Sequence, residues 1–587
     1  MLDLLIRGAT VVDGTGAAPF SADVGVREGR IASIGRIGEA ARRTLDASGA
    51  HLTPGFIDIH THYDGQASWD ASFSPSCYHG VTTVAMGNCG VGFAPVRPGE
   101  QARLVSLMEG VEEIPGSVLA EGVRWAWSSF AEYAQALDAT PHALDFATLV
   151  PHDCLRLFVM GERAARGEAA GPEDRAQMQA LLRAALEAGA AGFSTGRTDN
   201  HRTAKGEETP ASSAARDELL ALAGALRGLP HRVMHAVSDF DCMRHPPEGQ
   251  RAAFDAEYAL LEDMARTAGR PLALTWLERL NAPAQWEWLA QAAERSLAVG
   301  VDIRLQAACR PIGVLNGLDT SFNVLMAYPS YQEIAALPLA ERAARLREPA
   351  LKRKLLGESR VTLARDGSPI PPLVDQILGQ IERTAALMFP FAGPVPDYEP
   401  DPRSSFAHRA AARGCSALEA IYDYLAEGDG GNLVYFPIFN YLRGSLDTVH
   451  RMLTHPQALV ALSDGGAHVG TICDASFPTT LISHWTRHRS GARLALEQAV
   501  HLLSARNAAH LGLVDRGIVA VGRRADLNLI EFDKVAPLLP QLVRDLPAGG
   551  RRFVQKARGY LATLVAGEIV CEHGELTEAR PGRWVRA

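Results

Sequence analysis

His60 and His62 end an apolar segment, residues 53–62 (TPGFIDIHTH), whose pattern predicts a turn followed by a short buried strand. Residues i and i+2 of a strand point to the same face, so the two imidazoles project together. Neutral imidazoles side by side suit a borderline divalent cation such as zinc. The pair is also compatible with two surface histidines where a strand leaves the core. The residues downstream decide between these interpretations.

Three more metal-compatible side chains follow or end other strand-like runs. Cys89 lies in the segment GNCG (87–90), His235 ends RVMH (232–235), and Asp464 follows LVALS (459–463). A lone cysteine is usually an apolar filler, but the glycines at 87 and 90 would let a ligand or metal approach closely. A carboxylate such as Asp464 beside a hydrolytic metal can both ligate it and serve as general base. Five such groups at four strand ends predict a metal-dependent hydrolytic site.

Strand-like runs alternate with helical runs rich in Ala and Leu between residues 55 and 512. This alternation predicts βα units around a parallel sheet, of the (β/α)8 TIM-barrel type in the α/β class. Nine runs compete for eight strand positions, so we expect one of the runs at 301–305 and 432–436 to lie outside the barrel. The stretch from about 325 to 405 is predicted to be an insertion, and such long excursions often carry function.

Short strand-like runs also fill both ends of the chain, residues 1–54 and 513–587. Neither end has enough strands to be stable alone. We therefore expect one small β-domain built from both termini, with two independent appendages as the alternative.

Composition limits the classes of partner. The 587-residue chain is 47% hydrophobic and 21% charged, with a formal net charge of −9. It has no basic stripe for nucleic acid or membrane lipid, and no apolar run of the roughly 20 residues that a membrane span needs. The N-terminus does not resemble a signal peptide, and the eight cysteines include no CxxC pair. We expect reduced thiols and a cytoplasmic location.

The sequence resembles the amidohydrolase superfamily, and within it the D-aminoacylase (N-acyl-D-amino-acid deacylase) branch. The resembling motifs are TPGFIDIHTH, GVTTV (80–84), GNCG, GFSTG (192–196), His235, SDG (463–465) and GRRADL (522–527). The opening and closing motifs are specific for the superfamily, and GNCG points to this branch.

The resemblance implies a barrel with a β-domain and one or two divalent metal ions, zinc first among them. His60, His62, His235 and Asp464 would be ligands, and Cys89 would stand where other branches have a carboxylated lysine. A metal-bound water would attack the amide carbonyl, and Asp464 would pass its proton to the leaving amine. The resemblance is also compatible with a homo-oligomer.

The sequence departs from the family pattern at two positions. The sixth strand of the family ends in Ser-His, whereas this chain has Leu-Thr-Trp-Leu at 274–277, and the Trp276 indole cannot ligate a metal. We therefore expect one metal or a replacement ligand, with Trp276 in the substrate pocket. The arginine expected after SDG, to bind a substrate carboxylate, is also absent. Arg197 is our first candidate to replace it and Arg443 the second, while His468 is predicted to orient the carbonyl or the base.

The function predicted is that of a hydrolase acting on the carbon–nitrogen bond of a linear amide in an N-acyl amino acid, and the resemblance implies the D form. A cyclic amide, imide or lactam hydrolase is one alternative, because one fold serves many functions. A metal-poor protein that binds a small molecule without hydrolysis is another, since a histidine ligand is missing. Retention of Asp464 argues against a pure binding protein.

Overall fold

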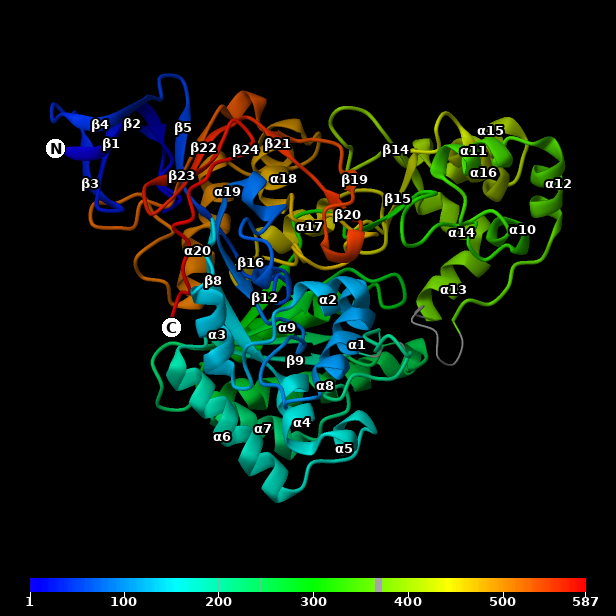
Figure 1. Ribbon diagram of the computed structural model, residues 1–587, viewed down its shortest axis with the longest axis horizontal. Coiled ribbons are helices and arrows are strands. Elements are labelled where there is room, and N and C mark those ends of the chain that lie inside the picture. The colour runs from blue at the N-terminus through cyan, green and yellow to red at the C-terminus, as the bar shows by residue number, and fades with distance from the viewer. Residues whose placement is uncertain (199, 243, 365–371) are drawn as a thin grey trace.

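Eight parallel strands form a barrel at the centre of the chain. The computed structural model describes residues 1–198, 200–242, 244–364 and 372–587 (Figure 1). In barrel order the strands are β6 (Phe56–Asp58), β7 (Val81–Met86), β8 (Asp145–Pro151), β9 (Gly192–Arg197), β10 (Val233–Ser238), β11 (Leu272–Trp276), β12 (Ile303–Ala307) and β16 (Ala458–Val460). A parallel bridge between Thr61 and Gly465 links the ends of the first and last strands. The predicted (β/α)8 barrel is confirmed, and of the two competing runs 301–305 belongs to it.

The helices that cover the barrel follow their strands in the chain. They are α1 (Gln101–Glu112), α2 (Gly116–Gly122), α3 (Phe130–Asp138), α4 (His152–Met160), α6 (Pro172–Ala188), α7 (Arg216–Gly224), α8 (Pro247–Ala268), α9 (Gln285–Ala298), α17 (Asp447–Leu453), α18 (Phe477–Ser483), α19 (Leu496–Leu503) and α20 (Ala505–Leu511). Helix α6 shows why they form: Pro172 occupies its first turn, Asp174 accepts a hydrogen bond from the Gly171 amide, and Met178 and Leu182 are buried on one face.

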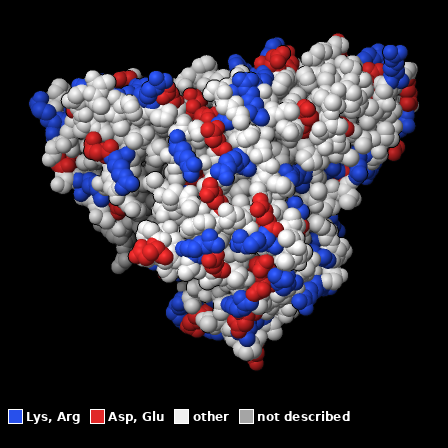
Figure 2. All heavy atoms as spheres, turned by 180° about the vertical axis from the view of Figure 1, so that it is seen from behind, with Lys and Arg blue, Asp and Glu red and all other residues white. Residues whose placement is uncertain are grey.

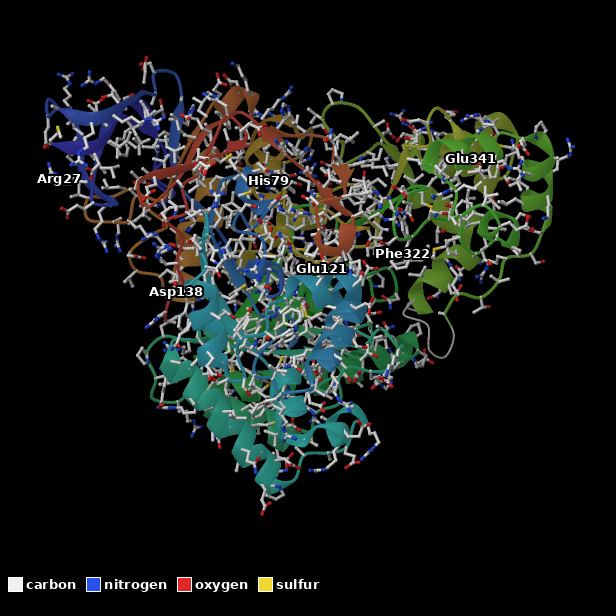
Figure 3. The ribbon with its side chains drawn as sticks, in the orientation of Figure 1. Arg27, His79, Glu121, Asp138, Phe322 and Glu341 are labelled. Atoms are coloured by element: carbon white, nitrogen blue, oxygen red, sulfur yellow. The ribbon has the colours of Figure 1, made fainter. Side chains whose placement is uncertain are left out.

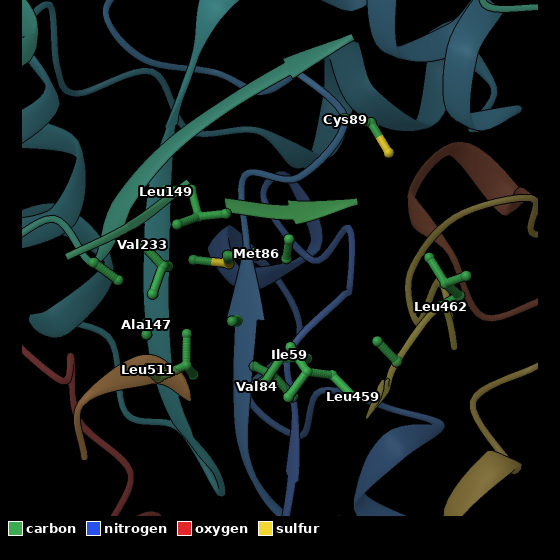
Figure 4. Close-up of a cluster of buried hydrophobic side chains, with 14 of the residues drawn as sticks. Ile59, Val84, Met86, Cys89, Ala147, Leu149, Val233, Leu459, Leu462 and Leu511 are labelled. Carbon is green, nitrogen blue, oxygen red and sulfur yellow. The ribbon is translucent and has the colours of Figure 1, made fainter. Parts of the chain in front are cut away.

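The barrel is filled by side chains rather than being a pore, as is usual for this architecture. Figure 4 shows part of this core, in which Met86 and Leu149 lie near Val233 while the Cys89 sulfur lies apart from them. The chemistry-bearing residues therefore stand at one end of a packed and rigid framework.

Strands from both chain ends share one nine-stranded mixed sheet beside the barrel. Its N-terminal members are β1 (Leu2–Val11), β2 (Phe20–Arg27), β3 (Arg30–Gly35), β4 (Ala41–Asp46) and β5 (His51–Pro54), and its C-terminal members are β17 (Leu527–Ile530), β22 (Tyr560–Val565), β23 (Glu568–Glu572) and β24 (Glu575–Leu576). Strand β5 pairs with β1 on one side and with β17 on the other, so it joins the two halves. The expected small β-domain from both termini is present.

Residues after the last barrel helix also bind back onto the barrel. The buried Arg516 guanidinium lies 2.5 Å from an Asp145 carboxylate oxygen and 3.0 Å from the Thr83 hydroxyl. Near the C-terminus, Trp584 forms a parallel bridge with Phe146 of β8. The segment from 513 onwards thus contributes to the barrel surface as well as to the β-domain.

The insertion between β12 and β16 is wider than the predicted 325–405. It contains an antiparallel sheet of β13 (Gly313–Asn316), β15 (Leu433–Pro437) and β14 (Phe389–Phe391). It also contains α10 (Pro329–Gln332), α11 (Leu339–Leu346), α12 (Pro349–Gly357), α13 (Pro372–Gly379), α14 (Ile381–Thr384), α15 (Phe406–Arg413) and α16 (Ala417–Ala426). It has its own apolar core and projects to one side of the molecule (Figure 1). The run at 432–436, strand β15, therefore lies outside the barrel.

The surface carries charges of both signs. Figure 2 shows basic and acidic side chains intermixed over one face. Within the described ranges, no helix is both long and apolar enough to cross a membrane.

Candidate metal centre and substrate cavity

Three buried side chains from the first two strand ends converge on one point. The Cys89 Sγ lies 3.4 Å from Nε2 of His60 and 3.8 Å from Nε2 of His62. An Asp464 carboxylate oxygen, from the loop after β16, lies 3.4 Å and 3.8 Å from the same two nitrogens. The possible ligand atoms of His60, His62 and Cys89 all lie within 4.8 Å of one another. The structure thus brings together four of the five ligands inferred from the sequence.

His235 stands beside this cluster, and its ring centroid is 4.7 Å from that of His60. Its Nδ1 accepts a long hydrogen bond, 3.4 Å, from the Cys89 amide, while its buried Nε2 has no hydrogen-bond partner. A neutral imidazole that accepts at Nδ1 carries its proton on Nε2. In this tautomer His235 borders the cluster without offering a lone pair at Nε2, and ligation through that atom would require the other tautomer and loss of the Cys89 amide hydrogen bond.

Neighbouring polar groups orient the two histidines of the pair. His60 Nδ1 lies 2.7 Å from the Gln306 side-chain oxygen on β12, which fixes the proton on Nδ1 and leaves Nε2 free for a metal. His62 Nδ1 lies 3.2 Å from a carboxylate oxygen of Glu112, the last residue of α1, without an aligned hydrogen bond. Burial lowers the pKa of His60 and His62, so both rings are neutral near pH 7.

The sequence interpretation missed Gln306 and Glu112. Gln306 could have been found in the same way as the ligands at the other strand ends, because it is the polar residue that directly follows the strand-like run at 301–305. Glu112 ends a helix, and nothing in its local sequence distinguishes it from a solvated acid.

Two of the converging residues occupy left-handed backbone conformations, with φ of 56° at Cys89 and 47° at Asp464. Such conformations cost about 1 kcal/mol or more and concentrate at functional sites. The glycines around Cys89 allow its loop to run against neighbouring strands, because a Cβ on Gly90 would lie 2.6 Å from the Gly196 nitrogen. These glycines therefore admit the backbone of adjacent strands, which corrects our expectation that they leave room for a ligand or metal.

His468 faces the cluster from the same loop as Asp464. Burial lowers its pKa, but the Glu113 hydrogen bond (3.1 Å at Nδ1) and the charges of Glu113, Glu112 and Asp464 outweigh that effect and raise it to about 9. The His468 ring is therefore an imidazolium at neutral pH and a hydrogen-bond donor. Burial in turn raises the pKa of Glu112 to about 8, although His468 opposes this shift.

A cavity of about 580 Å³ opens directly onto these residues. Its floor includes His60, His62, Cys89, Asp464 and His468, and its walls come from the βα loops and from the insertion. The cavity lies at the carboxyl ends of the barrel strands, where barrel enzymes carry out their chemistry. Its volume is in the range of small-molecule sites.

The sixth strand presents Thr275 to this cavity, and Trp276 does not line it. Adjacent strand residues face opposite sides, and Trp276 donates its indole N–H to the Trp286 carbonyl of α9 at 2.8 Å. Our prediction that Trp276 is a pocket residue is therefore wrong, because it packs between the barrel and a covering helix. The Thr275 hydroxyl is buried without a hydrogen-bond partner.

The two arginines proposed for substrate carboxylate binding both have other partners. Arg197 forms a two-bond ion pair with Glu257, at 2.5 and 2.9 Å, and does not line the cavity. Arg443 is mostly exposed and lies 3.6 Å from Glu278. These two predictions are corrected by the pairing of Arg197 and the exposure of Arg443.

Among the arginines that the structure describes, Arg279 lines the cavity, four residues beyond Thr275. It is only 7% exposed, it lies 5.3 Å over the Phe439 ring, and its guanidinium donates a long hydrogen bond (3.4 Å) to the Ser238 carbonyl. No carboxylate in the described part of the chain comes within ion-pair distance of it. The sequence could not single it out, because it lies beyond the strand end in an irregular loop.

The residues present fit a divalent cation. The thiol of Cys89, the two Nε2 atoms and the carboxylate of Asp464 form a mixed S, N and O donor set within one small volume. In the absence of an ion these groups are largely lone-pair acceptors that face one another, which is unfavourable in a buried site.

Comparison with known proteins shows the family to which the chain belongs. A model of the amidohydrolase family matches residues 43–358 and 403–571. An N-acyl-D-glutamate deacylase of Alcaligenes xylosoxydans xylosoxydans is 30% identical over 91% of this chain and 88% of its own length. An uncharacterised protein of Mycobacterium tuberculosis is 27% identical over 100% of this chain and 96% of its own.

Among solved structures, the N-acyl-D-glutamate deacylase of Bordetella bronchiseptica, complexed with zinc and a phosphonate inhibitor, has a TM-score of 0.62. It is 27% identical, and the match covers 100% of both chains. With the family model matched over most of its length, this chain belongs to the amidohydrolase family.

Proposed function

We propose that this protein is a metal-dependent hydrolase that cleaves the linear amide of N-acyl amino acids, with preference for the D form. The observation that carries the proposal is the convergence of His60, His62, Cys89 and Asp464 on the floor of a large cavity. The D preference rests on the relatives, whose names describe deacylases of N-acyl-D-amino acids.

We infer that His60, His62, Cys89 and Asp464 hold one ion, with His235 beside it. The mixed sulfur and imidazole donors favour zinc. When bound, such an ion supplies Lewis acidity that polarises the amide carbonyl and lowers the pKa of water. One ion agrees with the end of the sixth strand, where Thr275 and Trp276 offer no histidine for a second ion.

The protein's own groups supply proton transfer and orientation. The Asp464 carboxylate removes a proton from the attacking water and returns it to the amine nitrogen as the C–N bond breaks, so that a carboxylic acid and an amine leave the site. The His468 imidazolium, fixed by Glu113, donates a hydrogen bond to the amide carbonyl oxygen and stabilises the negative charge that develops there.

Arg279 completes the site as the partner of the substrate carboxylate. A buried guanidinium without an anionic partner is unfavourable, and a carboxylate ligand would neutralise it with a charge-assisted pair. Arg279 thus takes the role that the sequence interpretation assigned to Arg197 or Arg443.

All eight cysteines are free thiols in the structure, which agrees with a reducing, cytoplasmic setting.

Turnover of paired D and L substrates tests the proposal. Zinc-loaded protein is expected to hydrolyse N-acyl-D-amino acids with kcat/KM at least about tenfold above the L enantiomers, which is the discrimination a shaped pocket can provide. The panel includes hydantoins and lactams. Opening of those rings without cleavage of any linear amide would overturn the assignment in favour of a cyclic-amide hydrolase.

Replacing Arg279 with methionine is expected to raise KM for a carboxylate-bearing substrate by about 10- to 100-fold, since a charge-assisted hydrogen bond contributes roughly 1.5–3 kcal/mol. The effect on kcat should be smaller, because the carboxylate is remote from the breaking bond. Arg279→Lys should recover part of the loss, and Arg443→Ala should leave the kinetics unchanged. Steady-state kinetics of the three variants provide the check, and an unaltered KM in Arg279→Met would remove this residue from the site.

A further inference from the structure

The cavity has a polar floor and an apolar upper wall. The wall comes from the insertion and includes Val314, Phe322, Val324, Met326, Phe436 and Ile438. Figure 3 shows Phe322 where the insertion meets the barrel, whereas Glu341 lies on the outer side of the same insertion. We call the space beneath these six side chains the apolar chamber.

The chamber has few charged groups. Apart from the five floor residues, the charged side chains that line the cavity in the described ranges are Glu109, Glu112, Glu113 and Arg279. A carboxylate bound to Arg279 would neutralise the one cation outside the floor. The insertion also lines the cavity with Asn316, Ser321 and Asn323. The six side chains of the apolar chamber offer van der Waals contact rather than hydrogen bonds, so they suit an apolar group.

The cavity is large for a minimal N-acyl amino acid. Small-molecule sites of roughly 300–1,000 Å³ hold drug-sized ligands, so a substrate of only about a dozen heavy atoms would fill part of the 580 Å³. The rest would remain filled with water against apolar side chains. Filling that space with hydrocarbon gains about 0.8 kcal/mol for each buried methylene.

We propose that the amide substrate carries an extended apolar chain of about eight carbons or more, bound in the apolar chamber. This inference rests on the proposed amide hydrolysis and specifies its substrate class. The chain belongs to the acyl group or to the amine side, and the two sources are distinguished by experiment.

The first experiment measures kcat/KM with zinc-loaded protein for one D-amino acid carrying acetyl, butanoyl, octanoyl or dodecanoyl groups. A second arm keeps the acetyl group and lengthens an unbranched amino-acid side chain. Along the arm that uses the chamber, kcat/KM should rise by about three- to fourfold for each methylene, the factor that corresponds to its burial, until the space is filled. Turnover that is independent of chain length in both arms overturns the proposal and leaves the proposed function standing.

Two substitutions in the wall test the location. Val314→Trp fills part of the chamber and Met326→Gln makes it more polar. Both should bring the ratio of long-chain to acetyl kcat/KM down toward one. Val361→Trp is the matched control, because Val361 is an exposed residue of the same insertion outside the cavity. An unchanged ratio in both wall variants overturns the proposal.

A binding measurement separates this inference from catalysis. Titration calorimetry with dodecanoate and butanoate should give a dissociation constant at least tenfold lower for dodecanoate, with the difference reduced in Val314→Trp. If no amide is hydrolysed while this difference holds, the chamber stands and the proposed function falls. Equal affinities for the two acids count against the chamber.

Discussion

Replacing His60 with alanine is expected to remove the bound metal and to lower kcat/KM for amide hydrolysis by about a thousandfold or more. The Nε2 of His60 is 3.4 Å from both the Cys89 sulfur and the Asp464 carboxylate, so it occupies the middle of the donor set. Its loss leaves donors that no longer surround one point. Lewis-acid polarisation contributes several kcal/mol of transition-state stabilisation, which corresponds to a loss of this size.

Elemental analysis of purified protein, alongside kinetics, provides the measurement. Wild-type protein should contain about one zinc per chain and the His60→Ala variant close to none. The exposed His245 offers a matched control, since His245→Ala removes an imidazole away from the cavity. Two ions per chain would require ligands beyond the four that converge, and a wild-type protein that takes up no metal would contradict the catalytic assignment.

The second large effect concerns proton transfer. Asp464→Asn should lower kcat by about 10²- to 10⁴-fold, the usual contribution of a positioned general base. Asparagine has nearly the same shape and tolerates the left-handed backbone at this position, so the loop should keep its conformation. The amide oxygen cannot accept a proton from water at neutral pH, and the amine would leave without a proton donor.

Metal content distinguishes this mechanism from simple loss of the ion. His60, His62 and Cys89 remain in Asp464→Asn, so most of the metal should be retained while turnover is lost. Asp255→Asn, at an exposed carboxylate on α8, should behave as wild type. If Asp464→Asn turns over at the wild-type rate with its metal in place, another group is the base.

Much of the barrel and its floor could be predicted from the sequence, for a physical reason. Parallel strands end at one rim, so the polar residues that terminate apolar runs are brought together whatever lies between them. This rule brought together His60, His62, Cys89 and Asp464, and it would also have found Gln306.

The same rule failed where side-chain direction or tertiary pairing decides the outcome. At the end of β11, Trp276 and Thr275 differ by one position, and only the register against β12 shows which of them faces inward. Arg197 ends a strand as expected, but Glu257 on α8 pairs with it, and that helix lies sixty residues further along the chain. Arg279 and Glu112 come from a loop and a helix end, where no periodicity marks a functional residue.

The way strand β5 sits between β1 and β17 has a consequence for synthesis of the chain. The first five strands emerge from the ribosome before the barrel exists, but the hydrogen-bonding edge of β5 gains its partner only when residues 527–530 have been made. Until then the nascent protein exposes an unpaired strand edge, the kind of surface on which chains associate wrongly. Removal of the last sixty residues would leave that edge permanently open, so insolubility of such a truncation would follow from topology even though every floor residue of the cavity were retained.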